Sequence, residues 1–120
     1  MKRENVTYVT GASLVSCVVP LGRADAVLKA ARDLGVGTGI VYHGRGTGVR
    51  ERLGMLGIAV EAEKEIVVMM VANERLDMII DGLFQAAELD ATAAGFIVAT
   101  AVDKAALYIP EEALNQLKDA

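Results

Sequence analysis

The chain repeats one pattern of residues at a constant offset. Arg23, Asp25, Val27 and Leu28 recur as Arg75, Asp77, Ile79 and Ile80. In both copies the apolar residues are spaced by three and four, which is typical of an amphipathic helix, and an apolar stretch lies on either side. The sequence therefore predicts two strand–helix–strand units. Two such units with right-handed crossovers form a ferredoxin-like α+β fold, a four-stranded antiparallel sheet with two helices on one face.

Glycine, proline and capping residues set the limits of these elements. Pro20 ends the first strand, Gly35 stops the first helix, Asn73 is expected to cap the second helix, and Pro110 is expected to open a short C-terminal helix. We expect strands at 12–19, 38–43, 65–72 and 96–102, and helices at 24–34 and 76–87. The whole chain, 1–120, is then one domain, with a lead-in at 1–11, a long loop at 44–63 and a C-terminal segment at 110–120.

The third expected strand is apolar on both faces, because Ile66–Val71 contains no polar residue. A sheet covered by helices on one side only should alternate apolar and polar residues. We therefore expect a homo-oligomer, a closed trimer above all, in which bare sheet faces pack together. The alternative is that the N-terminal segment or the C-terminal helix covers the open face.

Composition and charge exclude several classes of protein. The net charge of −4 argues against a general nucleic-acid binder, which needs a basic face. No apolar run approaches the ~20 residues of a membrane span. The N-terminus has basic residues but no apolar region directly after them, so no signal peptide is expected. The single cysteine, Cys17, lies in an apolar run and fits a core residue of a cytoplasmic protein.

A glycine-rich stretch at the end of the second strand, HGRGTG, is the main candidate for a binding site. Backbone amides of such a run can cradle an anion or a phosphate. No helix opens directly after it, and no Gly-Lys-Ser/Thr follows, so it is neither a dinucleotide fingerprint nor a Walker loop. We interpret it as one wall of a ligand pocket between subunits. The alternative is a flexible exit from the strand.

The long loop combines charged and apolar residues, which suggests a surface that orders on a protein partner. The alternative is that its apolar residues pack back on the subunit. Single His43 is expected on the surface, and Glu65 is expected on a solvated strand edge. No Ser-His-Asp set, Cys-His set or clear acidic pair can be assembled, which favours a binding or sensing protein over an enzyme. The candidate partner-binding residues are Arg50, Arg52, Leu53, Met55 and Leu56.

These features together resemble the PII nitrogen-regulatory signal-transduction family, and above all its divergent PII-like members. The resemblance spans roughly residues 12 to 109 and is strongest at 38–48 and 63–67, with a weaker likeness in the helix NERLDMIIDGLFQAA. It implies a trimer that binds adenine nucleotides (ADP, AMP or ATP) between subunits and regulates a transporter, an enzyme or another regulator through the long loop. The implied ligand-binding residues are Thr38, Gly44, Arg45, Gly46, Thr47, Gly48, Lys64, Gly95 and Lys104.

The chain departs from the family pattern where phosphates are held. Thr92–Gly95 stands in place of Gly-Asp-Gly-Lys, and Ala106 and Tyr108 stand in place of two arginines, which leaves Lys104 as the nearby cation. A triphosphate loses charge-assisted contacts without these groups. ADP, AMP, another small anion, or no nucleotide at all therefore remain open as alternatives.

Two other functions remain open. A ferredoxin-like trimer of the divalent-cation-tolerance kind has a similar architecture, although one histidine and one cysteine serve metal binding poorly. A small enzyme with its active site in the same cleft is the other.

Overall fold

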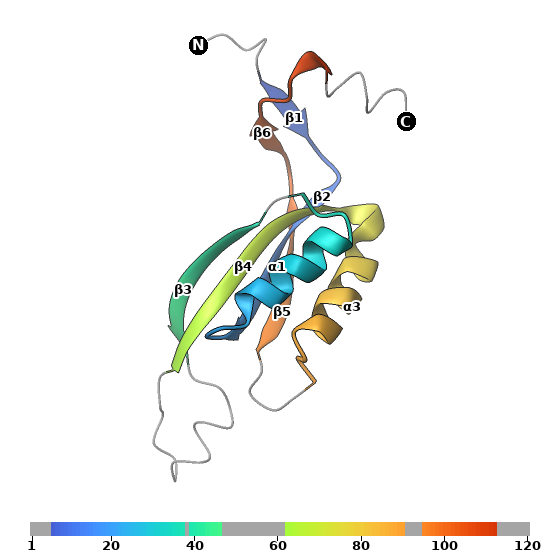
Figure 1. The fold of residues 1–120 in the computed structure, drawn as a ribbon. Helices are drawn as coiled ribbons and strands as arrows, with labels where there is room; N and C mark the ends of the chain where they lie inside the picture. The colour runs from blue at the N-terminus through green and yellow to red at the C-terminus, as the bar shows by residue number, and fades with distance from the viewer. Residues whose placement is uncertain (1–5, 38, 47–61, 91–94, 113–120) are drawn as a thin grey trace.

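The computed structural model describes residues 6–37, 39–46, 62–90 and 95–112 (Figure 1). Its elements in chain order are β1 (Thr7–Val9), β2 (Ala12–Pro20), α1 (Ala24–Asp33), β3 (Ile40–Gly46), β4 (Ala62–Ala72), the 3-10 helix η2 (Asn73–Arg75), α3 (Leu76–Ala86), β5 (Phe96–Val102) and β6 (Ala105–Leu107). No helix of these residues is long and apolar enough to cross a membrane.

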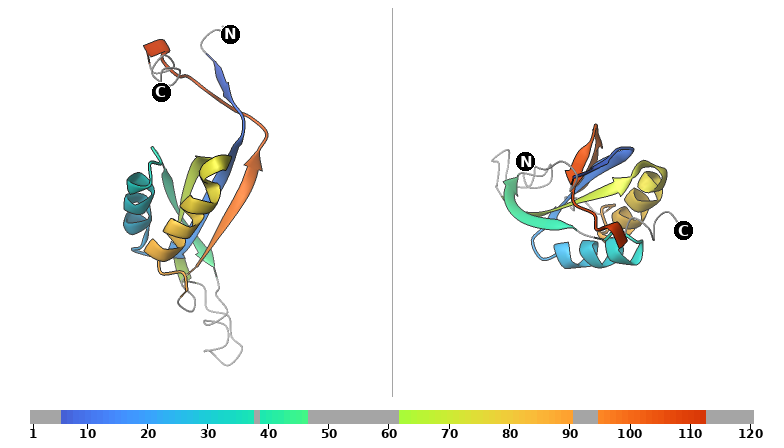
Figure 2. Two further views of the ribbon diagram at one scale, coloured as in Figure 1. Left: turned by 90° about the vertical axis from the view of Figure 1, so that its right-hand side faces the viewer. Right: turned by 90° about the horizontal axis from the view of Figure 1, so that it is seen from above.

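The main sheet has the strand order β3-β4-β2-β5, and all of its neighbouring strands are antiparallel. Each of the two strand–helix–strand units contributes one central and one edge strand. Both helices lie on the same face of the sheet, as Figure 2 shows from the side and from above. This confirms the expected ferredoxin-like α+β fold.

The core lies between the sheet and the two helices. Alternate residues of the two central strands point into it, among them Val15, Cys17 and Val67, which are fully buried. The helices supply Val27, Ile79, Leu83 and others from their apolar faces. Apolar residues at every second position of the strands thus pack against apolar residues spaced by three and four on the helices.

The other face of the sheet is apolar and uncovered within the subunit. Ile40 is 68% exposed, Tyr42 52%, Phe96 56% and Val98 45%. Ile66, Val68 and Met70 alternate with the core residues of β4 and so lie on this face as well. The apolar run at 66–71 therefore places side chains on both faces of the sheet, as expected. In the described part of the chain neither terminal segment covers the open face, because 6–9 and 105–107 form a separate ribbon.

That ribbon, which we call the arm, consists of β1 and β6 and projects past the end of the main sheet (Figure 1). Val9 pairs with Ala105 at its base, and the ladder of β2 and β5 ends at the pair Ala12–Val102. The arm therefore continues the same antiparallel register after a short interruption. Residues 7–9 are part of this paired arm, where the sequence analysis placed a lead-in.

Some expected boundaries were wrong. β3 and β4 continue to Gly46 and from Ala62, so part of the expected loop 44–63 is paired strand. Asn73 does not cap α3 with its side chain; it begins η2, and its side chain oxygen accepts a hydrogen bond from Ser13 Oγ at 2.7 Å. That bond comes from a strand 60 positions away, which local capping rules cannot foresee. Most of the expected C-terminal helix lies outside the described residues.

Candidate functional site

One end of the sheet gathers several of the residues that the sequence predicts to bind a ligand. β3 ends here at Gly46, β4 begins here at Ala62, and α1 begins here at Ala24. β5 begins at the same end, because Phe96 pairs with Val18 near the end of β2. We call this the loop end of the molecule; it is the lower end of the sheet in Figure 1.

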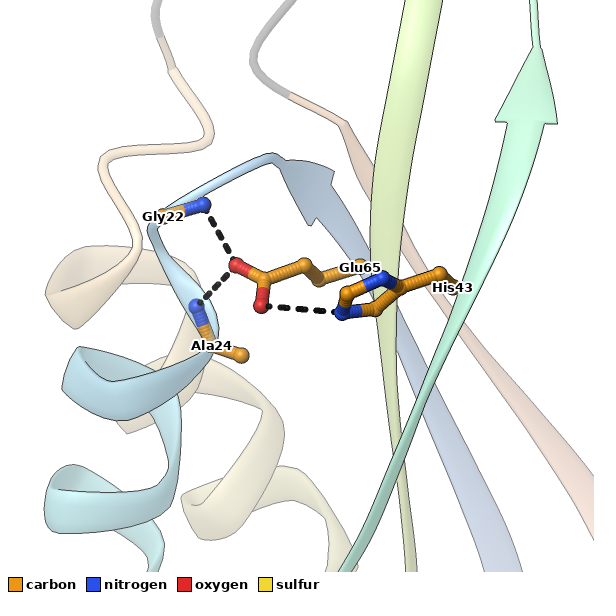
Figure 3. Close-up of polar contacts among 4 residues, drawn as sticks. All are labelled: Gly22, Ala24, His43 and Glu65. Carbon is orange, nitrogen blue, oxygen red and sulfur yellow. Dashed lines mark hydrogen bonds and ion pairs between the residues drawn. The ribbon is translucent and has the colours of Figure 1, made fainter.

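The carboxylate of Glu65 holds the start of α1 at this end (Figure 3). Its Oε1 atom accepts hydrogen bonds from the backbone amides of Gly22 at 2.5 Å and of Ala24 at 3.1 Å. The N-cap residue of α1, Arg23, makes no side-chain capping bond. A side chain from β4 therefore satisfies one of the amides that a helix leaves unpaired at its N-terminus, that of Ala24, as well as the Gly22 amide just before the helix. Its negative charge suits the helix dipole.

His43 completes this cluster from β3. Its Nε2 atom lies 3.6 Å from Oε2 of Glu65, and the two residues are direct partners across β3 and β4. The side chain of His43 is 67% exposed, whereas that of Glu65 is only 14% exposed. The single histidine thus lies at the surface, as expected, but in contact with a shielded carboxylate.

The hydrogen bond from the Ala24 amide lowers the pKa of Glu65 below its ordinary value of 4.5. The Gly22 amide and the nearby charge of His43 act in the same direction, while desolvation opposes them. Glu65 is therefore ionised throughout the neutral range. The expectation of a solvated edge residue was wrong, because β4 is a central strand and Glu65 turns toward α1.

The sequence offers no local signal for the role of Glu65. It lies 41 positions from Ala24 and 43 from Gly22, so the contact depends on how β4 pairs with β2. A carboxylate placed in the first turn of α1, such as Asp25, is the signal that a sequence analysis can find.

Four of the implied ligand-binding residues meet at the loop end. Gly44, Arg45 and Gly46 form the last part of β3, and Lys64 is the direct partner of Gly44 on β4. Gly44 and Lys64 alternate with the core-facing residues and so lie on the open face, while Arg45 lies on the face of His43. A Cβ atom at Gly44 would approach Ile66 Cδ1 at 3.0 Å, so a side chain here would require Ile66 to shift.

Gly95 also belongs to the loop end, but its backbone gives it a structural reason to be glycine. Its φ is +123°, and a Cβ atom there would overlap with the carbonyl oxygen of Val18. The chain can therefore enter β5 beside β2 only with glycine at this position.

Lys104 lies at the opposite end of the sheet. It follows β5, beyond the pair Ala12–Val102, and its Nζ atom is 5.4 Å from the centre of the Tyr8 ring. This is a cation–π contact across the base of the arm. Among the described residues, the implied ligand-binding residues therefore lie at the loop end, except for Lys104 at the opposite end.

A shallow pocket of about 280 Å³ lies between α1 and the start of β3. The residues on both sides of Thr38 line it, Gly37 and Gly39, together with Leu28, Ala31, Arg32 and Val36. Thr38 itself, Thr47, Gly48 and all five candidate partner-binding residues lie outside the described residues.

Two kinds of chemistry find little support in the described residues. Burial raises the pKa of Cys17 to about 11, so this thiol is a protonated core residue and a poor nucleophile. No three His, Cys, Asp or Glu side chains of residues 6–37, 39–46, 62–90 and 95–112 are grouped so that they could hold a metal ion.

Comparisons with known proteins agree with the fold. No protein-family model matches the sequence, and no curated protein matches it. Among solved structures, the chain is similar to the crystal structure of PII from Arabidopsis thaliana bound to citrate, with a TM-score of 0.59 and 17% sequence identity. The similarity covers 78% of this chain and 79% of the Arabidopsis chain. The chain therefore has the fold of the PII proteins, which confirms at the level of structure the resemblance found in the sequence.

Proposed function

We propose that the protein is a PII-like regulator that assembles as a homotrimer through its open sheet faces. The uncovered apolar face carries this proposal. A monomer would leave Ile40, Tyr42, Phe96 and Val98 in water, each about half exposed or more. An apolar patch across four strands is typical of a surface that other copies cover.

The ligand of this regulator is a small anion bound between subunits. Gly44, Arg45 and Lys64 lie at the loop end, and Lys104 lies at the arm end of the same subunit, so one subunit cannot bring them to one ligand. A neighbouring copy that places its arm beside the loop end would bring its Lys104 to the same cleft as Arg45 and Lys64. Adenine nucleotides are candidates, and citrate, which the Arabidopsis protein holds, is another.

The segment 49–63 is the element that meets the partner protein. It joins β3 to β4 and includes the first residues of β4, and both strands belong to the main sheet. Ligand bound at the base of such a segment can bias its conformation by binding one arrangement better than another. The proposal therefore assigns sensing to the cleft and partner regulation to the loop, with no catalytic step.

The assembly is tested by the mass of the protein in solution. We expect a trimer for the wild type and smaller species for Tyr42→Glu, which puts a charge in the open face. Met78→Glu is the matched control, because Met78 is 48% exposed but lies on α3, away from that face. A monomeric wild type, or equal effects of both changes, would contradict the assembly.

The ligand is tested by calorimetric titration of the trimer with ATP, ADP, AMP and citrate, with and without magnesium. We expect about one site per subunit, and a roughly tenfold loss of affinity in Arg45→Ala, Lys64→Ala and Lys104→Ala. Lys29→Ala serves as control, because Lys29 pairs with Asp33 on the exposed side of α1. Loss in the first two variants but not in Lys104→Ala would place the site within one subunit.

A deletion of residues 49–60 tests the loop. The shortened protein should keep the trimer and lose its binding partner in a pull-down. A trimer that falls apart would show that the segment supports the assembly and is not a separate recognition element.

A further inference from the structure

We propose that His43, Glu65 and the backbone amides of Gly22 and Ala24 at the start of α1 form a proton-sensitive clasp between the ends of β3 and β4 that flank the segment 47–61 in the sequence. Figure 3 shows the three parts in one line: the imidazole from β3, the carboxylate from β4, and the amides of Gly22 and Ala24. The role of the clasp in partner regulation rests on the function proposed above, but the clasp itself does not.

The geometry supplies the first argument. Oε1 of Glu65 is bound to two amides at 2.5 and 3.1 Å, while Oε2 faces Nε2 of His43 at 3.6 Å. One carboxylate thus joins β4 to α1 through one oxygen and to β3 through the other. The two oxygens share one negative charge. A change in the contact between Oε2 and His43 therefore also changes the hydrogen bonds that Oε1 accepts from the Gly22 and Ala24 amides.

The charge state of the imidazole supplies the second argument. Histidine is the side chain that ordinarily gains its charge between pH 5 and 8. The carboxylate stays ionised in that range, because the Ala24 and Gly22 amides lower the pKa of Glu65. Protonated His43 therefore meets a negative partner, and neutral His43 meets the same partner with only a weak polar contact. The clasp closes as the pH falls and loosens as it rises.

Among the described residues, Glu65 is the charged side chain with which His43 forms an ion pair. Glu63 and Arg45 lie on the same sheet face and are direct partners of one another across β4 and β3. Arg23, which precedes α1, is bound to Glu88 at 3.0 Å. Asp25 in the first turn of α1 is exposed, and Lys64 alternates to the opposite sheet face.

The position of the clasp connects it with function. His43 lies three residues before the end of β3, and Glu65 lies three residues after the start of β4. These are the strands that frame the candidate partner-binding segment. Closing the clasp ties both strands to the start of α1 and so restricts the ends of β3 and β4 between which the segment lies in the sequence.

The test uses the amides of Gly22 and Ala24 as reporters in an NMR titration of the ligand-free protein from pH 5 to 8. We expect both resonances to move through this range in the wild type. They should stay near their high-pH positions in His43→Gln, and near their low-pH positions in His43→Lys, which carries a constant positive charge. Lys29→Ala, remote from the clasp, should titrate like the wild type.

Hydrogen exchange at a single pH provides the second readout. At pH 5.5 the amides that pair residues 45 and 46 with 62 and 63 should exchange roughly two- to fivefold more slowly in the wild type than in His43→Gln, with no difference at pH 8. Resonances that do not move in the wild type, or that move equally in His43→Gln, would overturn the proposal. Because neither readout uses a nucleotide or a partner, silence in the calorimetric titration would leave the clasp intact and contradict only the proposed function.

Discussion

The two helices begin at equivalent places in their repeats but are held there by different chemistry. At the start of α3, the hydroxyl of Ser13 donates to the side chain of Asn73, and both groups are neutral. At the start of α1, the charged carboxylate of Glu65 accepts from backbone amides. The constant offset of the repeat carries position 13 onto position 65, so the two strands use the same place for these two contacts.

The C-terminal ends of the two helices also have the same backbone arrangement with different residues. In both helices the chain closes with a Schellman motif, in which Val36 N donates to Ala31 O after α1 and Leu89 N donates to Phe84 O after α3. The left-handed position is Gly35 after α1 and Glu88 after α3, with φ of +93° and +55°. The fold thus imposes one backbone path on both halves, and the side chains differ where they meet the loop end.

Two arginines, each just before one helix, contact the end of the other helix. Arg23, before α1, forms an ion pair with Glu88, after α3, and Arg75, before α3, donates to the carbonyl of Leu34 at the end of α1. The repeat relates these two arginines to each other. The helix-end hydrogen bonds and the arginine contacts thus recur in both halves of the chain. The cluster of Glu65 with the single histidine lies at the ends of the two strands that flank the segment 47–61.

The largest effect is expected at the helix ends. Gly35→Ala should lower the free energy of unfolding by about 1 to 2 kcal/mol, because alanine is strained at this φ and its Cβ would lie 2.9 Å from Arg75 Nη1. Glu88→Gly removes the same strain and should be stabilising or neutral, since the exposed pair with Arg23 is worth little. Urea denaturation measures both. If both changes lowered the free energy of unfolding equally, Gly35 and Glu88 would not occupy equivalent left-handed positions.

A smaller effect is expected at the start of α3. Ser13→Ala leaves the Asn73 side chain without its donor, and Ser13 is only 5% exposed, so we expect a loss of about 1 kcal/mol in the free energy of unfolding. The loss should not vary with pH, because neither group titrates. Ser16→Ala is the control on the opposite face of β2. A control that costs as much would show that the hydroxyl bond to Asn73 contributes nothing.

The smallest effect is expected at the start of α1, and its pH dependence is confined to acidic solution. Because the folded protein lowers the pKa of Glu65, the unfolded chain binds a proton here at higher pH than the folded chain does. The contribution of Glu65 is therefore complete above its ordinary value of 4.5 and is lost as the pH falls through the folded value. We expect the free energy of unfolding, measured from pH 3 to 7, to fall less steeply towards acidic pH in Glu65→Gln than in the wild type. Identical slopes would mean that the carboxylate makes no charge-dependent contact.

Much of the fold could be predicted because its signals are local. The fourth strand of the main sheet was expected at 96–102 and is found there, and the first helix was expected to end one residue later than it does. Apolar periodicity and glycine stops report such elements directly. The segment 44–46 was misjudged, because glycines that look like a loop in sequence are paired with β4 in the sheet.

The candidate site was less predictable, because its contacts join distant parts of the chain. The glycine-rich end of β3 and its neighbour Lys64 could be named from the sequence and lie together. The capping role of Glu65 and the separation of Lys104 from the loop end could not, because both depend on strand order and register. The implied ligand-binding residues remain predictions.

The sequence by itself determined the two repeated units, their apolar faces and the need to bury both sides of β4, because periodicity and composition act over short distances. Only the tertiary structure decided which carboxylate holds α1, why Gly95 must be glycine, and that Lys104 lies at the opposite end of the subunit from Gly44, Arg45 and Lys64. These follow from side chains and backbone brought together across the sheet. Antiparallel pairing makes neighbours of residues that the chain separates by forty positions or more, as it does for Glu65 and the start of α1.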